Sequence, residues 1–213
     1  MIDHVHAALI LVDLQPDFMP GGALPVEGGD EILAPIRRVM ASRRFPLQVA
    51  TQDWHPAGHV SFASRHAGKS PMEIIQLYGH DQVLWPDHCI QGTRGAELHP
   101  DLPWEHASVV IRKGEDPESD SYSGFRNNWN PAGERRRTGL AGYLRERDVT
   151  TIVLCGLARD VCVKWTAEDA ANDAFHTYLI WDLTRGVDPS ADDTVRADLE
   201  RAGVHLIESS DLP

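Results

Sequence analysis

The chain has little of several features that define whole classes of proteins. It has three cysteines and no Cys-x-x-Cys pair among its 213 residues, which is too few for a disulfide framework and suits a reducing compartment. No apolar run approaches the roughly 20 residues that a membrane-spanning helix needs. The first residues lack the basic segment and the small-residue cleavage site of a secretory leader. We therefore expect a cytoplasmic protein with no membrane partner.

Positive charge is also scarce. The chain has 20 Lys and Arg residues against 32 Asp and Glu residues, a formal net charge of −12. A field of that sign repels phosphate backbones, so we expect no nucleic-acid partner. Hydrophobic residues nevertheless make up 42% of the chain. This is enough to bury a core, and it excludes a disordered tail or a coiled coil.

Two nucleotide-binding motifs are missing as well. No Gly-x-Gly-x-x-Gly follows the first apolar run, so the dinucleotide fingerprint is absent. Residues 68–70 (Gly-Lys-Ser) resemble the end of a phosphate loop, but the first glycine of that motif would have to stand at Ala63, and no strand pattern precedes it. The sequence therefore gives no reason to expect a bound nucleotide.

Short apolar segments rich in β-branched residues recur along the chain, several of them separated by patterns typical of helices. Such segments are typical of parallel strands that helices cover on both faces. The predicted strands are Ala7–Val12, Leu47–Thr51, Ser108–Ile111, Thr151–Cys155, Thr177–Trp181 and Val204–Ile207. The predicted helices are Asp30–Arg43, Thr138–Glu146, Asp160–Ala174 and Ser190–Ala202. This alternation predicts a single α/β domain over residues 1–213, with the three layers of a doubly wound sandwich.

One long segment, residues 52–106, interrupts the alternation. It is rich in His, Pro, Trp and Gly. Loops of this length inside compact domains are usually functional or disordered, and this one has too many aromatic residues for disorder. We expect it to be ordered and to lie over the functional site.

Reactive side chains follow four of the predicted strands. Asp13 follows the first strand, Asp53 and His55 the second, Lys113 the third, and Cys162 lies in the helix after the fourth. Each has an ordinary explanation by itself, because aspartate favours turns, lysine favours exposed strand ends and a helical cysteine is usually packed. Ligands bind at the carboxyl ends of strands in open α/β sheets, so the convergence of all of them predicts a site.

Among the cysteines, Cys162 has the most reactive predicted environment. It would lie in the first turn of a helix, where the dipole favours a thiolate, and Lys113 would lower its pKa further. Asp13 could take the thiol proton and return it to a leaving amine, which is the nucleophile–base arrangement of acyl transfer. Cys155 falls within an apolar run and is expected in the core, whereas Cys89 could be a packed residue or a ligand.

A second cluster has the composition of a metal site. Asp53, His55 and His88 would supply one carboxylate and two imidazoles, a donor set that suits a divalent ion with open positions. In an extended Asp-x-His segment both side chains lie on one side. His59 and His66 are candidates for further ligands or for partners of the ligands. Zinc, with iron or manganese as alternatives, fits this set.

Several segments together resemble one known family. They are Asp13–Phe18, Gln52–Phe62, Trp85–Cys89, Gly92–Pro100, Asp120–Phe125 and Gly156–Val163. Over nearly the whole chain, and in order, they are similar to the nicotinamidase branch of the isochorismatase-like cysteine hydrolases. The resemblance implies a six-stranded parallel sheet and the hydrolysis of nicotinamide to nicotinate and ammonia through a cysteine thioester. Pyrazinamide would be an alternative substrate, and NAD salvage the physiological role.

The resemblance also implies roles for individual residues. Asp13, Lys113 and Cys162 match a catalytic triad, and Asp53, His55 and His88 match metal ligands. Leu157-Ala158 matches a cis peptide bond, beside which the N–H groups of Ala158 and Cys162 would face the substrate oxygen. Phe18, Trp85, Tyr122 and Leu157 match the pocket around the pyridine ring.

Two positions depart from the family pattern. The family commonly has Asn at the position of Pro16 and Thr at that of Arg159, where arginine could change the pocket rim.

Three alternative functions stay open. They are a related cysteine hydrolase without a metal, a metal-binding scaffold without activity, and a metal-dependent hydrolase in which Cys162 is inert. The sequence leaves the oligomeric state open, a homo-oligomer included.

Overall fold

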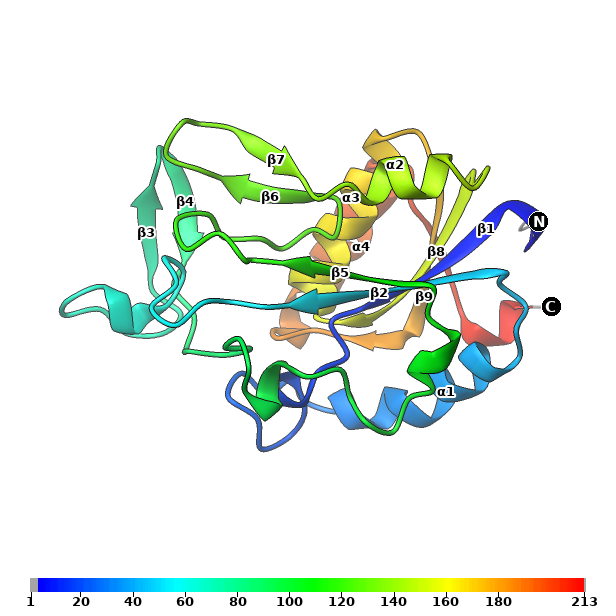
Figure 1. The fold of residues 1–213 in the computed structure, drawn as a ribbon, viewed down its shortest axis with the longest axis horizontal. Coiled ribbons are helices and arrows are strands. Elements are labelled where there is room, and N and C mark those ends of the chain that lie inside the picture. The colour runs from blue at the N-terminus through cyan, green and yellow to red at the C-terminus, as the bar shows by residue number, and fades with distance from the viewer. Residues whose placement is uncertain (1–3, 213) are drawn as a thin grey trace.

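Six parallel strands form the central sheet of the computed structural model, which describes residues 4–212 (Figure 1). Within that part of the chain the strand order is β10-β9-β8-β1-β2-β5. The strands are β1 (Ala7–Val12), β2 (Leu47–Asp53), β5 (Val109–Lys113), β8 (Thr151–Leu157), β9 (His176–Arg185) and β10 (His205–Ile207). All neighbouring pairs are parallel. The predicted six-stranded parallel sheet is confirmed.

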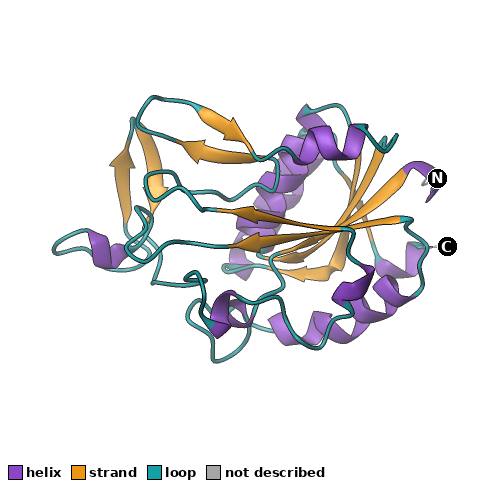
Figure 2. Ribbon diagram, in the orientation of Figure 1, coloured by secondary structure: helices purple, strands orange, loops and turns teal. Residues whose placement is uncertain are grey.

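Strand β1 lies in the middle of the sheet, and every one of its residues is buried. Its alternate side chains enter two separate hydrophobic clusters, Leu9 and Leu11 on one face and Ala8 and Ile10 on the other. Such strands need helices on both faces. Helix α1 (Leu33–Ala41) covers the first face, and α2 (Leu140–Arg145), α3 (Lys164–Asn172) and α4 (Asp192–Arg201) cover the second (Figure 2).

The predicted elements all exist, but several of their ends differ. Strand β9 runs four residues beyond the predicted end at Trp181, because its last residues pair with the end of β8. The predicted helix Asp160–Ala174 is two elements, a π-helical turn over Arg159–Val163 followed by α3. The prediction of one domain over residues 1–213, and of no leader at its start, also includes residues 1–3 and 213, which lie outside the described part.

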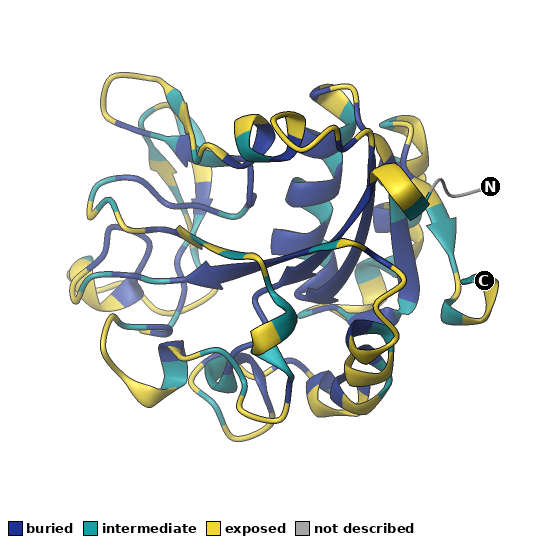
Figure 3. Cartoon of the chain, turned by 45° about the vertical axis from the view of Figure 1, so that its right-hand side comes forward, coloured by how far each residue is buried: buried dark blue, intermediate teal, exposed yellow. Residues whose placement is uncertain are grey.

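Two antiparallel hairpins were not predicted. Strands β3 (Ile74–Leu77) and β4 (His80–Val83) form one hairpin within residues 52–106, and β6 (Arg126–Trp129) and β7 (Arg135–Arg137) form the other. Strands β4, β6 and β7 are mostly polar, and the apolar β3 (Ile-Ile-Gln-Leu) is only four residues long, so none carries the apolar signal of the central sheet. The residues of both hairpins are mainly half-buried or exposed (Figure 3). Both lie beyond the carboxyl ends of β2 and β5 (Figure 1). Across residues 4–212, no helix is long and apolar enough to cross a membrane.

Candidate active site and metal centre

The carboxyl ends of three neighbouring strands bring Asp13, Asp53 and Lys113 together. Asp13 directly follows β1, whereas Asp53 and Lys113 are the last residues of β2 and β5. The Lys113 Nζ lies 2.9 Å from Asp13 Oδ2, and it also forms an ion pair with Asp53 Oδ1. It donates a further hydrogen bond of 3.0 Å to the carbonyl of Ser121. Lys113 is 1% exposed, so it is not a solvated strand end.

Asp13 is held in a fixed orientation. Its backbone is in the left-handed region, with φ of 46°, an uncommon conformation for a residue other than glycine. The Thr51 hydroxyl donates to Asp13 Oδ1 at 2.6 Å and accepts from the Asp13 amide at 3.2 Å. These contacts leave Oδ2 for Lys113. Sequence reasoning missed Thr51, which no motif had distinguished from its neighbours in the strand.

Cys162 lies in the π-helical turn that follows β8, and it completes the cluster. Lys113 Nζ donates to its sulfur at 3.4 Å, and the sulfur lies within 4.8 Å of a carboxylate oxygen of Asp13. Burial, reinforced by the two carboxylates, outweighs the Lys113 cation and raises the pKa of Cys162 well above its usual value. This direction is opposite to the lowered pKa that the helix dipole and Lys113 predict for the thiol. A base beside the sulfur is therefore needed to form the thiolate.

The charges around Cys162 suit that requirement. Burial opposes the charge of Lys113, but Asp13 and Asp53 outweigh it and hold the pKa of Lys113 well above its usual range. Lys113 is therefore a permanent cation. Burial also raises the pKa of Asp13, although Lys113 and Thr51 counteract it. A carboxylate with a raised pKa is a stronger base.

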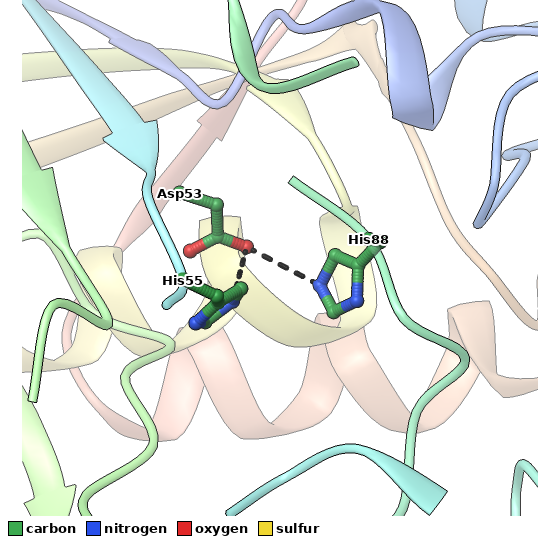
Figure 4. A group of neighbouring side chains, drawn as sticks. All are labelled: Asp53, His55 and His88. Carbon is green, nitrogen blue, oxygen red and sulfur yellow. Dashed lines mark ion pairs between the residues drawn. The ribbon is translucent and has the colours of Figure 1, made fainter. Parts of the chain in front are cut away.

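Asp53, His55 and His88 form a second group beside the first (Figure 4). Asp53 Oδ2 lies 3.5 Å from His55 Nε2 and 3.6 Å from His88 Nε2. The other ring nitrogens face backbone carbonyls. His55 Nδ1 lies 3.2 Å from the carbonyl oxygen of Gly114, and His88 Nδ1 lies 2.8 Å from that of Pro86. Such partners fix the orientation of metal-binding histidines. The three side chains therefore have the composition and orientation of a divalent metal site.

The electrostatics of this group also fit a bound cation. Burial alone would raise the pKa of Asp53, but Lys113 and His55 outweigh it and hold that pKa well below its usual value. Asp53 is therefore ionised. Burial alone would lower the pKa of His55, yet Asp53 outweighs it and raises that pKa. The space between Asp53 and His55 thus favours positive charge, which a metal ion can supply in place of a proton.

The other histidines considered above lie differently. Both ring nitrogens of His59 have protein contacts. Nδ1 lies 2.8 Å from the Ser61 hydroxyl, and Nε2 lies 3.0 Å from the Asp116 carbonyl oxygen. It nevertheless forms a second compact group with His55 and Asp120. His66 Nε2 lies 2.8 Å from the Val60 carbonyl, and His66 belongs to none of the donor groups found among the described residues.

A cavity opens above Cys162 and the donor group. Phe18, Trp85 and Tyr122, which the resemblance assigned to the ring pocket, line it, and so does Ala158, which it assigned to the oxyanion hole. The cavity wall also contains residues that we had not singled out: Leu24, Asp120, Ser121, Val161 and Val187. Asp120 belongs to the segment Asp120–Phe125, which resembles the family, and this resemblance could have identified it as a cavity residue. Asp13 and Lys113 lie behind Cys162, outside the lining.

Three further positions are placed by the structure. The Leu157–Ala158 peptide bond is cis, but the Leu157 side chain is fully buried in the core and does not line the cavity. Arg159 does not reach the pocket rim either. Its guanidinium contacts Thr184 and Asp192 and stacks on Trp181. Pro16 begins the 3₁₀ turn that carries Phe18 into the cavity, a position that suits proline.

The fold and this site define a family. The isochorismatase domain matches residues 7–211, and the chain belongs to the isochorismatase domain family. More particularly, it is 48% identical over 183 residues to a nicotinamidase of Acinetobacter baylyi, covering 86% of this chain and 83% of the relative. It is 42% identical over 208 residues to the nicotinamidase of Escherichia coli, covering 96% and 95%.

Solved structures agree with these relatives. A nicotinamidase and pyrazinamidase of Acinetobacter baumanii superposes with a TM-score of 0.92 at 43% identity, over 100% of both chains. The yeast nicotinamidase bound to the inhibitor nicotinaldehyde superposes with a TM-score of 0.88 at 30% identity, over 95% of this chain and 100% of the other. A zinc complex of the pyrazinamidase of Pyrococcus horikoshii superposes with a TM-score of 0.76 at 36% identity, over 95% of this chain and 99% of the other.

Proposed function

We propose that this protein is an amidohydrolase that converts nicotinamide to nicotinate and ammonia. One observation carries the proposal: Lys113 Nζ contacts both the Asp13 carboxylate and the Cys162 sulfur, at 2.9 and 3.4 Å, directly beneath an aromatic cavity. The nicotinamidases to which the chain is similar support this substrate. Pyrazinamide, another small aromatic carboxamide, is the expected second substrate.

The first half-reaction forms a thioester. Asp13 removes the proton of the Cys162 thiol, and the thiolate attacks the carboxamide carbon. Lys113 balances the negative charge on sulfur as the proton leaves. The N–H groups of Ala158 and Cys162 hold the oxyanion, an interaction worth roughly 3–4 kcal/mol per donor. The tetrahedral intermediate then collapses, the C–N bond breaks, and the proton on Asp13 passes to the departing ammonia.

The second half-reaction restores the enzyme. Water attacks the thioester carbon, and Asp13 takes its proton. The C–S bond breaks, and the proton on Asp13 returns to the Cys162 sulfur. The product leaves as nicotinate after its carboxyl proton passes to solvent or to the released ammonia. The same carboxylate thus serves both half-reactions, which its fixed orientation between Thr51 and Lys113 allows.

Asp53, His55 and His88 would hold one divalent ion, and we propose zinc, which the Pyrococcus horikoshii relative binds. When bound, the ion would supply a coordination position for the pyridine nitrogen and so orient the ring. Phe18, Trp85 and Tyr122 line the cavity and would surround the ring. The cytoplasmic location and the role in NAD salvage stay predictions.

Ammonia release from nicotinamide tests this function. We expect release by the wild-type protein, and a loss of at least about a thousandfold in Cys162→Ala. Alkylation should inactivate in proportion to the modification of Cys162, read by mass spectrometry. Cys155→Ala is the matched control, because this cysteine lies in the core. A Cys162→Ala protein that retained activity would overturn the cysteine mechanism and favour a reaction in which this thiol is inert.

A further inference from the structure

Gln82 stands out on the β3–β4 hairpin. Across residues 74–83, all of which the structure describes, it is the one buried residue, with 5% of its surface exposed. Buried amides are costly unless their polar atoms have partners. The contacts of Gln82 should therefore explain why this polar side chain points inward from a hairpin whose other residues are half-buried or exposed.

The contacts of Gln82 lead to the wall of the cavity. Its Nε2 donates to Asp120 Oδ2 at 2.7 Å and to the Tyr122 hydroxyl at 3.0 Å, besides its neighbour Val83. The same hydroxyl accepts from Trp85 Nε1 at 3.2 Å. Gln82 is thus joined to Asp120 and Tyr122, and through Tyr122 to Trp85, all three of which line the cavity.

Gln82 itself does not line the cavity. Within residues 4–212, its hydrogen bonds reach Val83, Asp120 and Tyr122, and so bypass Cys162 and its two charged partners. Tyr122 packs edge-on against both Trp85, at 6.1 Å, and Trp165, at 5.2 Å. The Tyr122 ring is therefore held by these two edge-on contacts and, at its hydroxyl, by Gln82 and Trp85.

We propose that Gln82 is a positioning residue, which sets the aromatic wall of the substrate pocket by holding the Tyr122 hydroxyl and the Asp120 carboxylate in register. The inference rests on the proposed function, because the ring of nicotinamide is what that wall would contact. Loss of the amide removes a donor from two buried acceptors, and the network must rearrange. The consequence falls on binding of the ring, whereas the acyl-transfer groups stay in place.

Steady-state kinetics of Gln82→Leu test this assignment. We expect KM for nicotinamide to rise about tenfold while kcat stays within about twofold, because uniform binding is lost. The rate of Cys162 alkylation by iodoacetamide should match the wild-type rate, which shows that the reactive centre is intact. Gln76→Leu is the matched control, because Gln76 is an exposed glutamine of the same hairpin and its amide contacts Asp81. It should behave as wild type.

Two further variants separate positioning from a general structural role. In a double-mutant cycle, Tyr122→Phe and Gln82→Leu should have markedly non-additive effects on KM, because both act through one hydroxyl. Gln82→Glu keeps the size of the side chain and places a carboxylate against Asp120, so it should raise KM in the same direction. It remains informative if Gln82→Leu fails to fold.

The outcomes distinguish this inference from the proposed function. An unchanged KM in a folded Gln82 variant, additive effects in the cycle, or a fall in kcat with altered alkylation would overturn the role of Gln82 and leave the function standing. If the wild-type protein releases no ammonia, the role of Gln82 is tested by measuring the affinity of nicotinate for the wild type and for Gln82→Leu by calorimetry. Equal affinity overturns the inference, and a wild type that neither hydrolyses nicotinamide nor binds nicotinate overturns both.

Discussion

The ammonium nitrogen of Lys113 lies 3.4 Å from the sulfur of Cys162, and both side chains are buried. The same nitrogen contacts Asp13 on one side and Asp53 on the other. Lys113 therefore joins the proposed nucleophile and base to the candidate metal ligands. A change at this one residue should affect stability, reactivity and metal binding together.

Lys113→Met is expected to be strongly destabilising. It leaves two carboxylates buried without their cation, and breaking a buried ion pair in this way costs about 3–5 kcal/mol of unfolding free energy. Urea denaturation measures the loss, with Lys69→Met as control, because Lys69 forms an exposed pair with Glu73. A Lys113→Met protein with wild-type stability and activity would refute the central position of this cation.

Gly114→Ala is expected to weaken metal binding. A Cβ at this position would overlap the imidazole ring of His55, and the backbone φ of +70° disfavours alanine as well. Metal content by mass spectrometry after dialysis should fall, and nicotinamidase activity with it. Gly68→Ala shares the backbone strain, with φ of +76°, but its Cβ would meet nothing within 4 Å. Equal metal content in the two variants would rule out the steric explanation.

Thr51→Val is expected to slow the reaction. It removes the hydroxyl that holds Asp13 Oδ1, with little change in side-chain size. Hydrogen bonds to charged groups are worth about 1.5–3 kcal/mol, so kcat/KM should fall roughly 10- to 100-fold. Thr177→Val, at a buried threonine that contacts the Phe175 carbonyl, provides the control. Similar activities of both variants would show that Asp13 does not need this hydroxyl.

Asp173 should make the stability of the protein depend on acid pH. It lies after α3 and pairs with Arg126 and Arg137 of the β6–β7 hairpin, both at 2.6 Å. Burial alone would raise its pKa, but the two guanidinium groups lower it below the usual value. The stabilisation is therefore present above the unfolded pKa of about 4 and is lost as pH falls through the folded pKa.

The corresponding experiment compares Tm between pH 3 and 7. Asp173→Asn should lower Tm by about 3–8 °C at pH 7, and its difference from wild type should shrink as pH falls below about 4. Asp101→Asn, at an exposed position, should follow the wild-type curve throughout. A difference that stayed constant with pH would mean that the ionised carboxylate is not what holds the hairpin.

Much of the fold follows from local pattern. Short segments rich in apolar residues marked all six strands of the sheet, since a strand buried on both faces carries few polar side chains. The hairpins were not predicted, because β3 and β4 have only four residues each and β6 and β7 are polar. The ion pair of Arg137 with Asp173 joins segments distant in the chain, and no local pattern shows it. The π-helical turn at Cys162 was likewise missed, because a helical sequence pattern does not distinguish it from the first turn of an α-helix.

By itself the sequence determined which residues meet at the sheet edge. Parallel strands end at a common edge, so Asp13, Asp53 and Lys113 converge once their strands are known. Tertiary structure alone decided how these groups behave. The raised pKa of Cys162, the inward-facing Gln82 and the turn of Arg159 away from the pocket all depend on burial and on partners distant in the chain. Desolvation and non-local contacts exist only after folding, so no local pattern contains them.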